Sequence, residues 1–144
     1  MAVADPPQTV RYGLSLATVP ASVPEARRRV RTELAAQGFD AEHPLTDTVL
    51  LVVSELVTNA VRHAAPRSPR TTVELVFSVD ELTVSVHDRH PHCPRRPEVP
   101  HQDGSGGWGL GLVHELAALA GGGTDTLADD DGGGKTMVVR LPLG

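Results

Sequence analysis

Hydrophobic residues recur at the spacing of one helix face over positions 45–64, at Leu45, Val49, Val52, Val53, Leu56, Val57, Ala60, Val61 and Ala64. This period predicts a helix that packs on a core. Glu55 and Asn59 interrupt the pattern and lie four residues apart, so they share one ridge of the helix. A carboxylate can accept a proton and a carboxamide oxygen can hold Mg²⁺. The same pair also fits an ordinary solvated edge of the helix.

The remaining pattern predicts a two-layer α/β sandwich. Alternation predicts strands at 9–17, 71–79, 81–87, 122–127 and 135–141. A helix is predicted from Val23 to Gln37, with Ser22 and Glu25 as a capping box, and another near 109–120. The first of these carries Arg27, Arg28, Arg29 and Arg31, which fit a solvated face or a partner-binding patch. Residues 129–134 are predicted to form a hairpin turn.

Composition agrees with one small domain at 9–143 after a loose segment at 1–8. The net charge of −5 gives no electrostatic argument for nucleic acid. We expect neither a membrane span nor a signal peptide, because no apolar run of the required kind is evident. The single cysteine, Cys93, cannot form an internal disulfide. These features predict a cytoplasmic protein.

Two further segments carry candidate chemistry. Asp88 follows the strand at 81–87, so its carboxylate can point into a pocket and accept from an exocyclic amine. The irregular stretch at 89–108 is interpreted as a lid, since loops of this length are usually functional or disordered. A glycine run at 104–111 leads into a helix, where backbone N–H groups can approach an anion. It is neither a Walker loop nor a Rossmann fingerprint.

A zinc site is a rival interpretation of the lid, on the basis of His87, His90, His92, Cys93 and His101. Histidine and cysteine are zinc ligands, but these spacings fit no standard zinc pattern.

Taken together, these segments resemble a known family. The run from Glu55 through Asn59 to Ala64 is similar to the N box of the ATP-binding fold shared by gyrase B, MutL and histidine kinases. Asp88 resembles its adenine-binding aspartate, and residues 107–112 match its Gly-x-Gly-Leu-Gly-Leu box. Residues 134–142 resemble its closing strand. At 144 residues, the chain resembles the stand-alone anti-sigma-factor serine kinases, especially short actinobacterial members.

The resemblance implies the Bergerat fold, an α/β (α+β) two-layer sandwich with a mixed, mostly antiparallel sheet and helices on one face. It implies ATP and Mg²⁺ as cofactors, with Glu55 as the catalytic base and Asn59 as the metal ligand. The nucleotide-binding residues that it implies are Asn59, His63, Asp88, Gly104, Gly106, Gly107, Gly109, Leu110, Gly111, Leu112 and Thr136.

The same resemblance implies a function in transcription regulation. The chain is expected to be an anti-sigma factor and an ATP-dependent serine/threonine protein kinase. Its expected partners are a sigma factor and a STAS-type anti-sigma-factor antagonist, without direct contact to nucleic acid or membrane. Members of the family often form dimers, so a homodimer is also implied.

Two departures from the family pattern keep other functions open. No glycine follows Asp88 directly, where the family has Gly-x-Gly, and Lys135 stands where it commonly has a threonine near the adenine. Thr136 is adjacent, but on a strand it would point to the opposite face. One alternative is a non-catalytic partner-switching module that sequesters a sigma factor or regulator, with nucleotide binding weak or lost. Another is a histidine-kinase-like fragment that acts in trans on a phosphoacceptor histidine.

Overall fold

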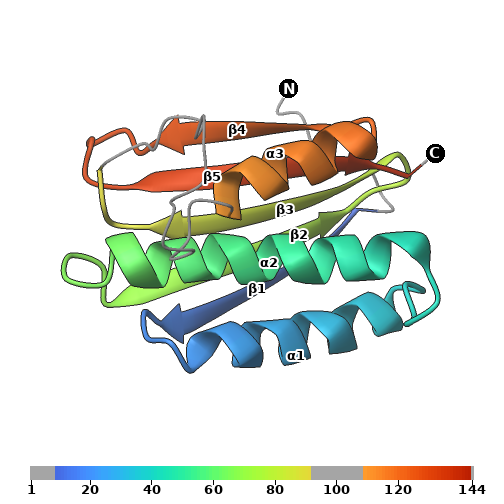
Figure 1. The fold of residues 1–144 in the computed structure, drawn as a ribbon, viewed down its shortest axis with the longest axis horizontal. Helices are drawn as coiled ribbons and strands as arrows, with labels where there is room; N and C mark the ends of the chain where they lie inside the picture. The colour runs from blue at the N-terminus through green and yellow to red at the C-terminus, as the bar shows by residue number, and fades with distance from the viewer. Residues whose placement is uncertain (1–8, 92–108, 144) are drawn as a thin grey trace.

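The structure is a computed structural model and describes residues 9–91 and 109–143 (Figure 1). Its elements, in chain order, are β1 (Val10–Ala17), α1 (Ser22–Ala36), α2 (Pro44–His63), β2 (Arg70–Phe77), β3 (Glu81–Asp88), α3 (Gly109–Leu119), β4 (Gly123–Ala128) and β5 (Lys135–Pro142). Every predicted strand and helix is confirmed, with ends that differ by at most two residues. Most of the predicted lid lies outside the described residues.

The five strands form one open sheet in the order β1-β2-β3-β5-β4. Every neighbouring pair of strands is antiparallel. Figure 1 shows α1, α2 and α3 side by side over one face of this sheet. The predicted α/β sandwich is therefore confirmed, and its sheet is antiparallel throughout.

The core lies between the helices and the inward face of the sheet. In β3, Leu82, Val84 and Val86 are buried beneath the helices, whereas the residues between them are half-buried on the outer face. This alternation is typical of an antiparallel sheet covered on one side. From the helical layer, Val30 of α1 and Val53 of α2 are fully buried in the same cluster.

The first turn of α1 differs from the prediction. The helix begins at Ser22, and its cap position is Ala21, which makes no side-chain capping bond. The predicted capping box of Ser22 and Glu25 is therefore wrong. The preceding turn supplies acceptors instead, because the N–H of Ser22 bonds to the carbonyl of Val19 at 3.0 Å. Ser22 is itself buried inside the helix.

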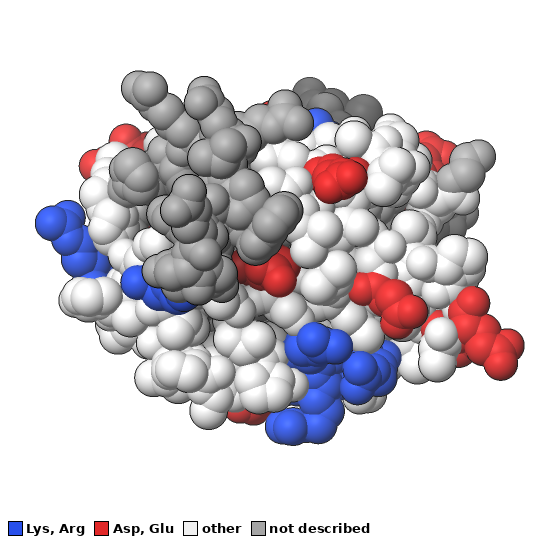
Figure 2. Space-filling model, viewed as in Figure 1, with Lys and Arg blue, Asp and Glu red and all other residues white. Residues whose placement is uncertain are grey.

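The outer surface of α1 is basic. Figure 2 shows blue side chains gathered over this helix, where Arg28, Arg29 and Arg31 are exposed. Arg29 lies 3.9 Å from Glu25 across one helical turn, a surface pair of small energetic weight. The arginines therefore lie on the exposed face of α1, opposite its buried stripe, as both interpretations of this patch require.

The helix α2 is the central helix of the layer. Its length and mean hydropathy of 1.3 would be enough for a membrane span, so the expectation that no segment reaches this level is wrong. Half of the apolar stretch of α2 is buried within the domain. A core helix has this property as well, so the pattern is explained by packing on the sheet.

Gly122 connects α3 to β4 at a point of close backbone approach. A Cβ atom built on this residue would overlap the carbonyl oxygen of Arg140 in β5. The N–H of Gly122 bonds to the carbonyl of Ala117 at 2.8 Å, which fixes the connection against α3.

We predict that Gly122→Ala lowers the free energy of unfolding by about 3 kcal/mol, because a backbone clash can be relieved only by moving a strand. Gly13→Ala is the matched control, since its added Cβ would meet only the carbonyl of Val73, at 4.0 Å. Urea unfolding of both variants gives the comparison. Equal stability of the two would contradict the close approach at Gly122.

Candidate functional site

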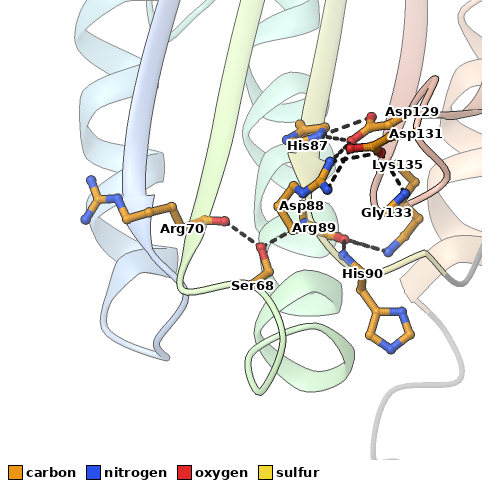
Figure 3. Close-up of polar contacts among 10 residues, drawn as sticks. All are labelled: Ser68, Arg70, His87, Asp88, Arg89, His90, Asp129, Asp131, Gly133 and Lys135. Carbon is orange, nitrogen blue, oxygen red and sulfur yellow. Dashed lines mark hydrogen bonds and ion pairs between the residues drawn. The ribbon is translucent and has the colours of Figure 1, made fainter.

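Asp88 and Lys135 form a buried ion pair where β3 ends and β5 begins (Figure 3). They are direct partners in the β3–β5 register, so both side chains point to the helix-covered face. Lys135 Nζ donates to Asp88 Oδ1 at 2.9 Å and to Oδ2 at 3.0 Å. Only 3% of Asp88 and 2% of Lys135 is exposed. The predicted adenine acceptor is thus held by a side chain of the same protein.

Backbone contacts fix the chain around this pair. The N–H of His90 donates to Asp88 Oδ1 at 2.9 Å. The hydroxyl of Ser68 accepts from the N–H of Arg89 at 2.8 Å and donates to the carbonyl of Arg70 at 2.7 Å. The loop after α2 is therefore tied to the end of β3.

Gly134 allows the β4–β5 hairpin to lie against the end of β3. A Cβ atom at this position would be 2.6 Å from the carbonyl oxygen of Asp88. The hairpin turn predicted at 129–134 is confirmed, because the N–H of Asp129 bonds to the carbonyl of Gly134 at 2.9 Å and Gly132 has a φ of 71°. A side chain at Gly134 would separate the two strands next to the ion pair.

A second polar cluster lies on the outer face of the same strand end. His87 Nε2 donates to Asp129 at 2.9 Å, and Arg89 bonds to Asp129 at 2.7 Å and to Asp131 at 3.0 Å (Figure 3). The hydrogen bond from His87, followed by that from Arg89, lowers the pKa of Asp129. Arg89 likewise lowers the pKa of Asp131, whose carboxylate raises the pKa of the Arg89 guanidinium in return. These groups hold Arg89 outward while Asp88 points inward.

The polar ridge of α2 faces the inward side of β5. Asn59 Nδ2 lies 3.7 Å from the sulfur of Met137, and Asn59 is half-buried. Met137 and Lys135 are successive inward residues of β5, which stand about 7 Å apart along a strand. Asn59 therefore lies over the same end of the sheet as Asp88. Glu55 is half-buried one turn earlier, and His63 is exposed in the last turn of α2.

The first turn of α3 lies beside this ridge. The helix begins at Gly109, followed by Leu110, Gly111 and Leu112, which are half-buried. Leu110 lines a small pocket together with Leu56 of α2 and Met137 of β5. The glycine-rich start of α3, whose first N–H groups have no acceptor within the helix, thus lies near the residues that flank Glu55 and Asn59.

Of the remaining predicted residues, the structure describes only Thr136, which lies away from this cluster. Gly104, Gly106 and Gly107 lie outside the described residues. Thr136 pairs with His87 in the register, on the outer face of the sheet, so the sheet separates its side chain from Asp88. A ligand that reached Asp88 from the helix side would meet Lys135 in place of Thr136.

For the rival zinc site, the structure describes only part of the proposed ligand set. His92, Cys93 and His101 fall outside the described ranges. Within 9–91 and 109–143, no three histidine, cysteine, aspartate or glutamate side chains gather as a metal site. His87 is bonded to Asp129.

Ser68 was missed by sequence reasoning. Ser68 is fully buried, and its hydroxyl bonds to the backbone of Arg70 in β2 and of Arg89 just after β3, although its only sequence signal was a turn rich in proline. Lys135 was noted as a departure from the family pattern, but its contact with Asp88 was not predicted. The signal available was its place at the first position of a strand.

Comparison with known proteins identifies one family. The model of the histidine kinase-like ATPase domain matches residues 16–137, which is most of the chain. No curated protein matches the sequence.

Solved structures give the same fold. A histidine kinase from Burkholderia phymatum STM815 is similar with a TM-score of 0.53 and 18% identity, over 94% of this chain and 72% of that one. The histidine kinase domain of a blue-light activated histidine kinase from Erythrobacter litoralis EL346 gives 0.51 and 20%, over 84% of this chain and 61% of that one. At such identities the likeness concerns the fold alone.

We predict that Lys135→Met lowers the free energy of unfolding by about 3–5 kcal/mol, because it leaves the Asp88 carboxylate buried without a counter-charge. Arg140→Met is the matched control on the same strand, since its pair with Asp125 is exposed and worth about 1 kcal/mol or less. Urea unfolding measures both. The double variant Asp88→Asn, Lys135→Met should regain part of the loss, and similar losses for Lys135→Met and Arg140→Met would contradict the burial of the pair.

Proposed function

Because the chain belongs to the histidine kinase-like ATPase domain family, we propose that it is an ATP-binding regulatory protein that transfers the γ-phosphoryl group to a serine of a partner protein. The observation that carries the proposal is the position of Asn59. Its contact with Met137 brings the polar ridge of α2 over the end of the sheet where Asp88 lies. The start of α3 lies beside the same ridge.

The residues of this cluster fit Mg²⁺ and phosphates. The amide nitrogen of Asn59 contacts Met137, while its oxygen makes no hydrogen bond with any residue in the described ranges. Carboxamide oxygens suit Mg²⁺, so Asn59 would hold the ion, which supplies positive charge that neutralises the phosphates. The first N–H groups of α3, at Gly109, Leu110 and Gly111, would donate to phosphate oxygens.

Glu55 has the position and chemistry of a general base. It lies one helical turn from Asn59, and its carboxylate makes no hydrogen bond or ion pair in the part of the chain that the structure describes. It would accept the proton of a serine hydroxyl while that oxygen bonds to the γ-phosphorus. The bond from this phosphorus to the bridging oxygen breaks and ADP leaves.

We further propose the partners that the sequence resemblance suggests. The phosphorylated serine would belong to a STAS-type anti-sigma-factor antagonist, and the second partner would be a sigma factor. The protein would then act in the cytoplasm as a switch that alternates between these two partners, as a homodimer. Incubation of the pure protein with labelled ATP, Mg²⁺ and candidate antagonists tests the proposal directly.

One observation favours a second candidate function. The carboxylate of Asp88 is held by Lys135 and buried, so recognition of adenine there is opposed by the fold. A non-catalytic module that sequesters a sigma factor or regulator, with weak nucleotide binding, would need no base recognition. Phosphate transfer to an antagonist distinguishes the two candidates.

Mg-ATP should raise the melting temperature of the protein, because a ligand that binds only the folded state stabilises it. Asn59→Ala should reduce this shift, since the proposed metal ligand is lost, whereas Thr32→Ala, at an exposed position of α1 outside the proposed site, should leave it unchanged. Thermal unfolding with and without Mg-ATP measures the effect. A melting temperature unaffected by saturating Mg-ATP, together with no heat of binding in calorimetry, would refute nucleotide binding.

Glu55→Gln should slow phosphoryl transfer by about 10²- to 10⁴-fold while nucleotide binding stays nearly unchanged, because only the proton acceptor is removed. Glu25→Gln, on the surface of α1, is the matched control and should retain full transfer. Single-turnover assays with labelled ATP and the antagonist give the rates. Full activity of Glu55→Gln would assign the base elsewhere, and tight sigma-factor binding by a wild type that never transfers phosphate would favour the non-catalytic module.

A further inference from the structure

The ammonium group of Lys135 occupies the place on the Asp88 carboxylate where an amino group of a ligand would bind. It contacts both carboxylate oxygens, at 2.9 and 3.0 Å, from the strand position directly opposite. An aromatic amine on a purine would bond to a carboxylate oxygen at a similar distance. The amine carries no full charge, so it is a weaker partner for Asp88 than the ammonium is.

Asp88 also has little remaining capacity to accept hydrogen bonds. A carboxylate offers about four lone-pair positions. Lys135 occupies one on each oxygen, and the N–H of His90 bonds to Oδ1 at 2.9 Å. Among the contacts of the described residues, one position remains, on Oδ2, in a residue that is only 3% exposed. Because Asp88 is buried beside Lys135, a base amine would have to displace Lys135 to reach the carboxylate.

Displacement of Lys135 is opposed by its surroundings. The side chain is only 3% exposed, so an ammonium that left Asp88 would be buried without a counter-charge. Strand β5 cannot easily move away from β3 either, since Gly134 places the β4–β5 hairpin against the carbonyl of Asp88. The pair is thus a fixed part of the inward face of the sheet.

We propose that Lys135 is a specificity-determining residue that keeps the base subsite closed, so that this chain binds nucleoside triphosphates through their phosphates with little selection for the 6-amino group of the base. The inference rests on the proposed nucleotide binding near Asn59 and the start of α3. It assigns the affinity to the phosphate end of the ligand, and it makes Asp88 a structural partner of Lys135.

The test compares two ligands on unmodified protein. ATP and purine riboside triphosphate differ only in the 6-amino group, so the ratio of their dissociation constants reports whether Asp88 accepts from that group. Calorimetry in Mg²⁺ should give a ratio below about 3 for the wild type. A charge-assisted hydrogen bond would instead give about 10- to 100-fold.

Lys135→Thr removes the competing cation and leaves space for a base. This variant should bind ATP about 10- to 100-fold more tightly than the wild type does, and it should now discriminate against purine riboside triphosphate by a similar factor. Lys135→Arg keeps a cation opposite Asp88 and is the matched control, with the low ratio of the wild type. The gain for Lys135→Thr and its absence for Lys135→Arg together separate base recognition from a general effect on stability.

The remaining outcomes overturn the inference in distinguishable ways. A wild type that already prefers ATP by 10-fold or more shows that Asp88 accepts the amine with Lys135 in place, and the proposed function then stands without the inference. An unchanged ratio in folded Lys135→Thr also refutes the inference. If Lys135→Thr does not fold, the wild-type ratio decides. Failure of both ligands to bind any variant refutes nucleotide binding, and the inference falls with it.

Discussion

The sheet can bury only one of its two faces, and this constraint determines where the other elements lie. Most inward residues of the central strands are apolar, while the alternate positions are polar or only half-buried. All three helices must therefore cover the same face (Figure 1). Asp88 lies on the same face of β3 as Leu82 and Val86, so its carboxylate points toward the helices that cover this face. Strand β3 thus contributes both apolar core residues and one buried carboxylate to the inward face of the sheet.

A buried carboxylate needs a counter-charge, and β5 supplies it from the directly opposite position. The energetic character of this pair differs from that of the cluster on the outer face. Arg89 and Asp131 are half-exposed, so water and salt screen their interaction. Asp88 and Lys135 have little access to solvent, so the loss of either partner leaves an unpaired charge. Asp88, the last residue of β3, and Arg89, which follows it, therefore lie in two electrostatic environments on opposite faces of the sheet.

The periodicity of apolar residues was sufficient to predict the helices and strands. It could not predict contacts that depend on which strands pair. Apolar alternation was sufficient for the strands, and the helical period was sufficient for α2 with Glu55 and Asn59 on one ridge. The pairing of β3 with β5 could not be read in the same way, because α3 and β4 lie between them in the chain. The contact between Lys135 and Asp88 depends on this pairing, so it could not be predicted from the sequence. The capping box at Ser22 failed because the helix begins at Ser22 itself, whose N–H bonds to the carbonyl of Val19, so Ser22 is a helical residue and Ala21 is the cap.

The chain contains a single lysine, and its side chain is only 3% exposed. Reagents that acylate ε-amino groups, and proteases that cleave only after lysine, therefore have one target in the whole sequence. That target becomes reactive only when Lys135 leaves Asp88. The rate of lysine modification is thus an intrinsic reporter of this opening, and no label has to be introduced to measure how often the inward end of the sheet exchanges with solvent.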